Sequence, residues 1–245
     1  MSSLVLYQFP ISHFCEKARW ALDYKGLDYT TKNLLPGLHV KTTKKLAAKS
    51  SVPVLVHEGR SIQGSEQIIT YLDEHFPDKK LTPVNSQEAQ SALEWERYLD
   101  KEIGVHLRRY LYHTLLNQPN MVIGFFAKDG PFWAKPFLKL MYPKLSRTMR
   151  KLMDINEATA AKSRQTVLMA LERMNDALDE NKYLVGNRFS RADLTAAALL
   201  APLFMPPQYG LDWPDTLPEP LQSEVNALEP QLVWAKEIYR KHRSA

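Results

Sequence analysis

The first ~80 residues alternate between strand-like and helix-like patterns, and this alternation restricts the fold more than any other feature of the chain. Short apolar-rich runs are followed by segments in which apolar residues recur every three or four positions. The expected order is a strand at 4–9, a helix at 13–25, a strand at 27–34, a short helix at 39–49, a hairpin at 52–62 and a helix at 65–76. Helices between strands indicate parallel pairing across the crossovers, whereas the hairpin is antiparallel. We therefore expect a small mixed sheet covered by helices.

The residues that follow carry only helical patterns. Polar residues and prolines at 76–87 indicate a connection between two folding units. A long helical pattern spans 86–116, and the prolines within 121–154 are expected to interrupt any helix there. We divide the chain into a mixed domain at 1–79, a linker at 80–86 and an all-helical domain at 87–245.

The positive charge of the chain has two possible meanings. There are 32 lysines and arginines against 27 aspartates and glutamates, and the densest basic stretch lies at 134–151. This stretch would suit an anionic partner such as nucleic acid or a membrane surface. No nucleic-acid motif accompanies it, so we favour a solvated helix face. We expect neither a nucleic-acid partner nor membrane contact.

The expected compartment follows from three features of the sequence. No run reaches the ~18 apolar residues needed to span a bilayer. The N-terminal residues lack the charged region and cleavage site of a signal peptide. The only cysteine, Cys15, cannot form an internal disulfide, which fits a reducing compartment. We expect a soluble cytoplasmic protein.

The segment from Ser12 to Cys15 lies at the expected start of the first helix. The unpaired N–H groups and the dipole of a helix N-terminus would stabilise a thiolate there, whether the thiol belongs to the protein or to a ligand. The structural alternatives are a helix cap for Ser12, worth about 1 kcal/mol, and a small buried apolar side chain for Cys15. Spacing alone favours the structural alternative for both residues.

Other short motifs also have structural interpretations. Pro53 opens a strand after Val52, and an X-Pro bond is usually trans. Ser65 is expected to cap the helix at 65–76 and can hold a ligand carboxylate at its N-terminus. Ser190 and Asp193 have the spacing of a helix capping box.

These motifs, in this order and spacing, resemble the cytosolic glutathione S-transferase family. The resemblance includes the Val52-Pro53 pair, the capping box and the S-x-x-I-x-x-Y-L pattern that starts at Ser65. It implies an α/β thioredoxin-like N-terminal domain followed by an all-α C-terminal domain. The same fold also serves in non-enzymatic modules, so the resemblance is less specific for activity than for fold.

The resemblance implies a role for Ser12 in catalysis. Ser12, His13 and Phe14 fall on the family's S-P-F motif, with His13 in place of the proline. Ser12 would donate a hydrogen bond to the glutathione thiolate and thereby lower the pKa of the thiol. The classes that use a tyrosine carry it at the position of Gln8, so a tyrosine mechanism is not expected.

The resemblance also implies a glutathione site. The backbone of Val52 would pair with the cysteinyl moiety of glutathione, with Pro53 as a cis residue, and Ser65 would hold the γ-glutamyl end. The usual acidic or glutamine partner of that serine is replaced by Gly64, for which Gln63 or Glu66 would compensate. The implied glutathione-binding residues are Phe14, Val52, Pro53, Gln63, Ser65 and Glu66.

A pocket for an electrophile is expected between the domains. Its candidate residues are Tyr110, Tyr112, His113, Phe125, Phe126, Phe132 and Trp133. The alternative for these side chains is packing in the core or in a dimer interface.

We therefore predict a homodimeric glutathione transferase of the detoxification type. Glutathione is the co-substrate, and its thiolate attacks a small hydrophobic electrophile with Ser12 as the thiolate stabiliser. No metal is expected, because no His/Cys cluster has ligand spacing. Two alternatives stay open: a glutathione-dependent thiol reductase that uses Cys15, and a non-catalytic binding module, which Gln8 and Gly64 favour.

Overall fold

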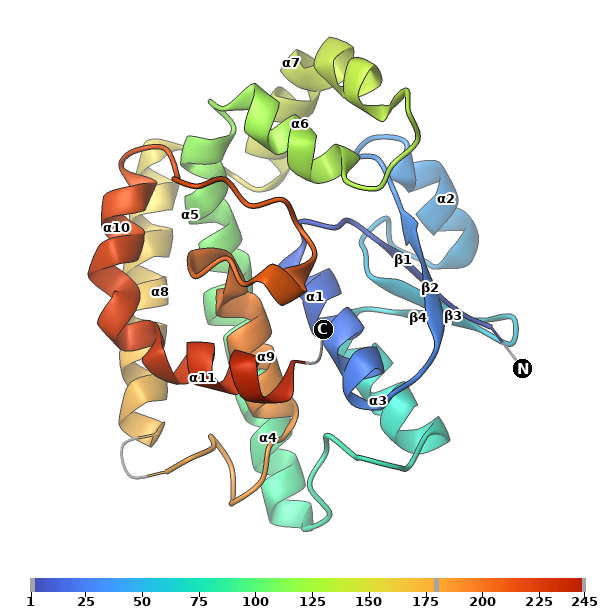
Figure 1. Ribbon diagram of the computed structural model, residues 1–245, viewed down its shortest axis with the longest axis vertical. Helices are drawn as coiled ribbons and strands as arrows, with labels where there is room; N and C mark the ends of the chain where they lie inside the picture. The colour runs from blue at the N-terminus through green and yellow to red at the C-terminus, as the bar shows by residue number, and fades with distance from the viewer. Residues whose placement is uncertain (1–2, 179–180, 244–245) are drawn as a thin grey trace.

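The computed structural model describes residues 3–178 and 181–243. Figure 1 shows a sheet-containing part on one side and a helical part on the other. The sheet-containing part consists of β1 (Leu4–Gln8), α1 (His13–Tyr24), β2 (Tyr29–Asn33), α2 (His39–Leu46), β3 (Val54–His57), β4 (Arg60–Gln63) and α3 (Ser65–His75). This is the element order that the sequence predicts.

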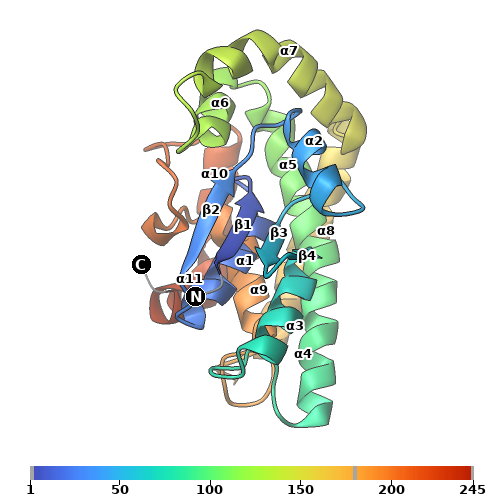
Figure 2. The same ribbon diagram turned by 90° about the vertical axis from the view of Figure 1, so that its right-hand side faces the viewer.

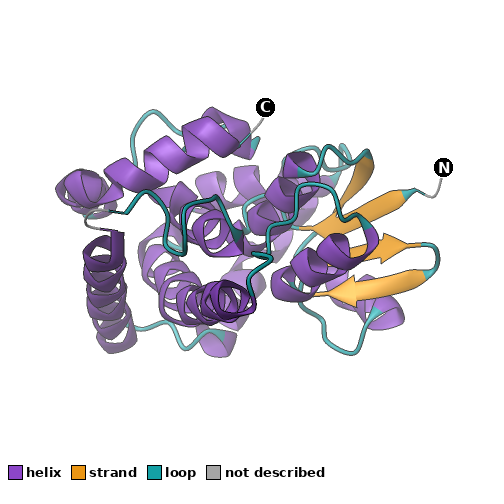
Figure 3. Ribbon diagram, turned by 90° about the horizontal axis from the view of Figure 1, so that it is seen from below, coloured by secondary structure: helices purple, strands orange, loops and turns teal. Residues whose placement is uncertain are grey.

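The strands form one mixed sheet in the order β2-β1-β3-β4. β1 runs parallel to β2 and antiparallel to β3, and β3 and β4 form the expected antiparallel hairpin. The prediction of parallel pairing across the crossovers is therefore wrong for β3. The connection from β2 has a turn before α2 and a bent segment after it, and the chain returns beside β1 in the opposite direction. Figure 3 shows the four strands at one edge of the molecule, next to the helical part.

Helices cover both faces of this sheet. α1 and α3 lie between the sheet and the helical part, and α2 lies on the outer face (Figure 2). The predicted apolar face of α1 is buried at Ala18, Ala21 and Leu22. Gly26 ends this helix with a φ of 67°, a backbone conformation that glycine adopts without strain. These contacts fix the N-terminus of α1 at the edge between the two parts.

The helical part has more breaks than the sequence indicates. Its α-helices are α4 (Ser86–Leu99), α5 (His106–Leu115), α6 (Pro119–Ala127), α7 (Ala134–Leu152), α8 (Glu157–Leu178), α9 (Arg191–Leu200), α10 (Leu221–Leu228) and α11 (Val233–His242). A π-helical segment, η1 (Asp100–Val105), divides the pattern that is expected to be one helix at 86–116. No helix within the described ranges has the length and apolar character that crossing a bilayer requires. The domain boundaries proposed above remain predictions.

Proline affects the helices differently from what the sequence predicts. Pro119 lies at the start of α6, where its missing N–H is harmless. Pro131 lies in the break before α7, as expected. Pro136 and Pro143 lie inside α7, so the predicted interruption at these two residues is wrong. Pro136 is in the first turn, where no intrahelical partner is lost. Pro143 is exposed, so the carbonyl that it leaves free faces solvent.

Buried charges join the sheet-containing part to the helical part. Lys17 on α1 pairs with Glu96 on α4 (Nζ to Oε1, 2.7 Å) and with Asp100 (Nζ to Oδ2, 2.9 Å). Glu96 also pairs with Arg191 of α9, and Arg191 donates to the backbone carbonyl of Glu66 on α3. Burial lowers the pKa of Lys17, but the carboxylates of Asp100 and Glu96 outweigh it and raise that pKa overall. The ammonium therefore stays charged inside the protein.

The predicted capping box at the start of α9 is confirmed. The Asp193 carboxylate accepts from the backbone N–H of Ser190 (2.8 Å) and of Leu184 (2.8 Å). The Ser190 hydroxyl oxygen accepts from the backbone N–H of Ala192. This box fixes the start of α9, and Arg191 is the first residue of that helix.

We expect the substitution Lys17→Met to destabilise the protein by about 3–5 kcal/mol, because it leaves the buried carboxylates of Glu96 and Asp100 without their cation. Urea unfolding followed by circular dichroism measures the change. Lys101→Met is the matched control, because Lys101 is exposed and its pair with Glu102 lies at the surface. Equal effects of the two substitutions would contradict the structural role of Lys17.

Candidate functional site

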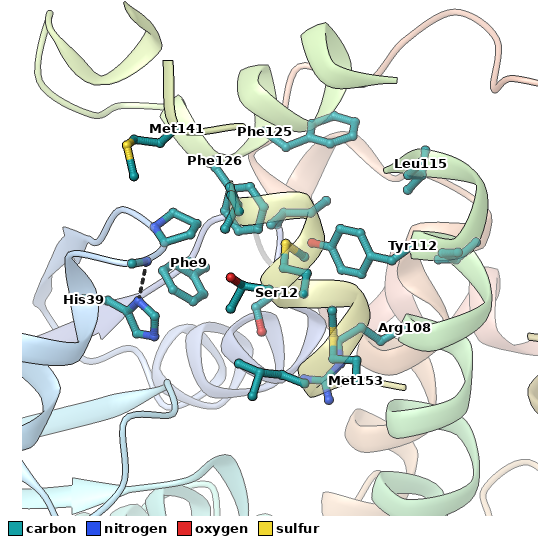
Figure 4. A pocket seen from close by; sticks show the side chains of 18 of the residues that line it. Phe9, Ser12, His39, Arg108, Tyr112, Leu115, Phe125, Phe126, Met141 and Met153 are labelled. Atoms are coloured by element: carbon teal, nitrogen blue, oxygen red, sulfur yellow. Dashed lines mark hydrogen bonds between the residues drawn. The ribbon is translucent and has the colours of Figure 1, made fainter. Parts of the chain in front are cut away.

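A cavity of about 690 Å³ opens beside the N-terminus of α1. Figure 4 shows that its walls come from the segment after β1, the start of α2, and helices α5, α6 and α7. Most of the lining side chains are aromatic, aliphatic or methionine. Among residues 3–178 and 181–243, no aspartate or glutamate lines it. A cavity of this size and composition suits a small apolar molecule.

Ser12 lies at the border of this cavity and is the N-cap of α1. A turn places it there, in which its N–H donates to the carbonyl of Phe9 (3.1 Å). Its hydroxyl oxygen accepts from the N–H of Cys15 at 3.4 Å, so the predicted cap is confirmed. Within residues 3–178 and 181–243, the group that competes for the hydroxyl proton is the thiol of Cys15, which receives a hydrogen bond from Ser12. A neutral thiol is a weak acceptor, so the proton can be donated to a ligand instead.

His13 follows Ser12 and lines the same cavity. Its Nε2 is buried without a partner in the described part of the chain. Burial lowers the pKa of His13 to about 3, and the positive charge of Arg108 contributes to the shift. The imidazole is therefore neutral at physiological pH.

Cys15 lies inside the core and not at the cavity. Its side chain is 0% exposed. Burial raises the pKa of its thiol, and a hydrogen bond from Ser12 offsets only part of that effect. A protonated, inaccessible thiol is a poor nucleophile. The structural interpretation of Cys15 therefore fits its surroundings.

A second, smaller pocket of about 210 Å³ brings together most of the residues that the family resemblance implies for glutathione. Its lining includes Phe14, Val52, Pro53, Ser65 and Glu66. The Val52-Pro53 peptide bond is cis. The backbone of Val52 forms no hydrogen bond within the described ranges, so its N–H and C=O remain open to a ligand.

The N-terminus of α3 differs from the sequence prediction. Gly64 takes the N-cap position with a φ of 98°, and Ser65 is the first helical residue, so the predicted Ser65 cap is wrong. Gly64 fits here because residues with a side chain rarely adopt this conformation. With no side-chain cap, the N–H groups of residues 65–67 have no acceptor in the described chain. These N–H groups form the N-terminal end of α3, and a helix N-terminus favours the binding of anions.

The two residues expected to replace the missing side chain at Gly64 behave differently. Glu66 lines the smaller pocket, and the hydrogen bond from Arg97 lowers the pKa of its carboxyl group. Gln63 does not line the pocket, because its amide donates to the backbone carbonyls of Lys49 (2.7 Å) and Ser51 (2.8 Å). The side chain of Gln63 thus holds the loop before β3, and its assignment to the glutathione site stays a prediction.

In two segments of the chain, residues only two positions apart line the two different pockets. Ser12 lines the cavity and Phe14 lines the smaller pocket. Likewise, Ser50 lines the cavity and Val52 the smaller pocket. A ligand in the smaller pocket would therefore need only a short extension to reach the hydroxyl of Ser12.

The structure brings some of the aromatic candidates to the cavity and leaves others outside. Tyr112, Phe125 and Phe126 line it, whereas Tyr110, His113, Phe132 and Trp133 do not. The face of α5 toward the cavity consists of Arg108, Leu111, Tyr112 and Leu115, at helical spacing. Tyr110 and His113 fall on other faces of that helix. The side chain of Phe132 is 97% exposed.

Sequence reasoning also missed several lining residues. Phe9 makes edge contacts with His39 (ring centroids 4.9 Å apart) and with Phe126 (5.5 Å). The imidazole of His39 accepts a hydrogen bond from the N–H of Gly37 (3.0 Å). Arg108 extends from α5 toward the cavity (Figure 4). Its position four residues before Tyr112 was the one available signal, because it places both residues on one helical face.

Both parts of the chain match sequence profiles of one family. The profile described as "Glutathione S-transferase, N-terminal domain" matches residues 6–80, and "Glutathione S-transferase, C-terminal domain" matches residues 132–219. The two matches together span more than half of the chain. The chain therefore belongs to the glutathione S-transferase family, and the predicted thioredoxin-like domain followed by a helical domain is confirmed.

Individual relatives are more distant. Glutathione S-transferase 1 of Dianthus caryophyllus is 41% identical over 85 residues, which are 34% of this chain and 38% of that protein. The protein of Arabidopsis thaliana called glutathione S-transferase TCHQD is 26% identical over 81% of this chain and 76% of its own length. The chain spans less than half the length of the first curated relatives it matches.

Solved structures share the fold. A crystal structure of a glutathione S-transferase from Methylobacillus flagellatus with glutathione bound superposes with a TM-score of 0.59 at 20% identity. The superposition covers 96% of this chain and 98% of that chain. At this identity the likeness concerns the fold alone.

We expect the thiol of Cys15 to resist modification in the folded protein, because it is buried and protonated. A thiol reagent such as 5,5′-dithiobis(2-nitrobenzoate) should react slowly with native protein and rapidly in 6 M guanidinium chloride, as followed by absorbance. Rapid reaction of the native protein would contradict this placement.

Proposed function

We propose that the protein is a glutathione transferase, in which the thiolate of bound glutathione attacks a small apolar electrophile held in the cavity. The observation that carries the proposal is the position of Ser12. Its hydroxyl has only the weakly accepting thiol of Cys15 as a competing partner in the described chain, and Ser12 lines the cavity two residues before Phe14, which lines the smaller pocket. We further propose that the protein is cytoplasmic, acts in detoxification and forms a homodimer.

Glutathione would lie in the smaller pocket with its γ-glutamyl end at α3 and its thiol toward Ser12. Its γ-glutamyl carboxylate would accept from the free N–H groups at the start of α3, where the helix dipole favours an anion. Its ammonium group would face the carboxylate of Glu66, which also lines the pocket. Its cysteinyl backbone would pair with the free N–H and C=O of Val52. This placement directs the thiol toward Ser12.

Ser12 would stabilise the thiolate by donating its hydroxyl proton. A hydrogen bond to a charged group contributes about 1.5–3 kcal/mol. A stabilisation of this size lowers the pKa of the thiol by about one to two units. The N-terminal dipole of α1 acts in the same direction. Neutral pH then supplies more thiolate for the attack.

Of the two alternatives, the thiol reductase receives no support from the structure. It needs a reactive Cys15, and that thiol is buried with a raised pKa. The non-catalytic module rests on Gly64, which offers no side chain to glutathione. The free N–H groups beside Gly64 and the carboxylate of Glu66 can take over that contact. We therefore keep the transferase.

We expect Ser12→Ala to shift the pH at which turnover is half-maximal upward by about one to two units. At pH 7, kcat/KM should fall about 10- to 100-fold, since the thiol ionises less. The pH–rate profile with 1-chloro-2,4-dinitrobenzene measures the shift. Calorimetry in two buffers measures the proton released when glutathione binds. That release should disappear in the variant.

Asn85→Ala is the matched control for the loss of a helix cap. Asn85 caps α4 by accepting from two backbone N–H groups, and it lies outside both pockets. Its loss should reduce stability by about 1 kcal/mol and leave the pH profile unchanged. An unshifted profile in Ser12→Ala would remove Ser12 from catalysis. No glutathione binding to the wild type would favour the non-catalytic module.

Gly104 positions Phe14 for glutathione, and we expect Gly104→Ala to disturb it. An added Cβ would lie 2.5 Å from Cζ of Phe14. Overpacking of this kind costs about 1–3 kcal/mol, and it would force the ring of Phe14 to move within the smaller pocket. Stability and glutathione affinity should therefore both fall, as unfolding and calorimetry measure.

Gly124→Ala is the control, because no atom lies within 4 Å of its added Cβ. The double variant Phe14→Leu with Gly104→Ala removes the clash and should recover the stability that the single variant loses. Unchanged glutathione affinity in Gly104→Ala would show that Phe14 does not contribute to binding.

A further inference from the structure

The cavity contains a positive charge that no described residue neutralises. Arg108 extends from α5 into the region below Tyr112, close to Met153 (Figure 4). Its Nε is buried and has no hydrogen-bond partner. Its guanidinium forms no ion pair with any residue in the ranges 3–178 and 181–243.

The lysines and arginines that are buried in the described chain each have a carboxylate partner. Lys17 pairs with Glu96 and Arg19 pairs with Glu16, both at 2.7 Å. The remaining pairs of this kind are Lys25 with Asp73, Arg191 with Glu96 and Arg243 with Glu16. Arg108 is partly exposed, but its Nε is buried and no carboxylate of the described chain pairs with its guanidinium. It lines the cavity of about 690 Å³, where a ligand can reach it.

The surroundings of Arg108 do not reduce its charge. Burial lowers its pKa, Tyr112 raises it and the neighbouring Arg109 lowers it. A guanidinium nevertheless keeps its proton at physiological pH. His13, which faces Arg108 from α1, is neutral. An unpaired buried charge is unfavourable, so a ligand that brings an anion to it gains more than it would at a surface.

The rest of the cavity limits the kind of anion. Most of the other lining side chains are apolar, among them Leu111, Met149 and Met153, and the cavity lining also includes the exposed Lys144. A small hydrated anion would leave these surfaces exposed, whereas an apolar body would cover them. The ligand therefore needs one anionic end and one apolar body.

We propose that the cavity selects apolar carboxylates, whose carboxylate pairs with Arg108 while the apolar body fills the space toward Ser12. Planar guanidinium and carboxylate groups match in a bidentate arrangement. The binding of such acids does not depend on glutathione. Their use as electrophiles rests on the proposed function, because the thiolate must then stand at Ser12.

Binding is tested with a pair of ligands that differ only in charge, 4-phenylbutyrate and 4-phenylbutanamide, by calorimetry without glutathione. The wild type should prefer the acid. In Arg108→Met the affinity for the acid should fall about 10- to 100-fold, the effect of losing a charge-assisted hydrogen bond. The affinity for the amide should stay the same or rise. Arg108→Lys should recover part of the preference.

Arg109→Met is the matched control. Arg109 follows Arg108 on α5, but it donates to the carbonyl of Met153 (2.8 Å) and does not line the cavity. The Arg109→Met variant should keep the preference for the acid over the amide. Equal affinity of wild type and Arg108→Met for 4-phenylbutyrate would overturn the proposal. So would a loss of glutathione affinity in Arg108→Met with unchanged binding of the acid, since Arg108 would then hold glutathione itself.

Turnover is tested with 4-chloro-3-nitrobenzoate and its neutral amide. In both reactions the thiolate sulfur bonds to the ring carbon that carries chlorine, and chloride leaves with the bonding electrons. The ratio of kcat/KM for acid over amide should fall about 10- to 100-fold in Arg108→Met and persist in Arg109→Met. An unchanged ratio would overturn the selection of acids in the reaction. If neither compound turns over while the acid still binds through Arg108, the proposed function fails and the binding site stands.

Discussion

The buried carboxylate of Glu96 lies between two cations that come from different parts of the chain, Lys17 on α1 and Arg191 on α9. None of the three charges could remain buried alone, because removing an ion from water without a partner is strongly unfavourable. The sheet-containing part therefore keeps its charge balance only in contact with the helical part. This contact fixes where the N-terminus of α1 stands relative to α4 and the segment that follows it.

The segment that follows α4 connects this ion-pair cluster to the cavity and the smaller pocket. Asp100, the second partner of Lys17, is the first residue of the π-helical segment η1. π-helical turns are uncommon and occur often at functional sites. Here η1 brings Gly104 against the ring of Phe14 and leads directly into α5. The ion pair at Lys17 thus helps to set the distance between Ser12 on α1 and the cavity face of α5.

The sequence predicts well what depends on local pattern. The order of strands and helices around the sheet, the Ser12 cap and the capping box at Ser190 are local features, and the structure has them. The antiparallel direction of β3 depends on turns whose path is not encoded by periodicity. The hydrogen bonds of the Gln63 amide to the loop before β3 are tertiary contacts, which the sequence does not predict. The Ser65 cap failed by one residue, a usual uncertainty at helix ends.

Arg108 shows why the most informative residue of the cavity was not found from the sequence. An arginine on an amphipathic helix normally lies on the solvated face or pairs with a nearby carboxylate. Whether a charge is compensated depends on every element packed around it, and no local pattern records that. Lys17 and Arg191 each pair with a carboxylate, whereas no carboxylate of the described chain pairs with Arg108. The same tertiary packing that neutralises the first two charges therefore leaves the third one for a ligand.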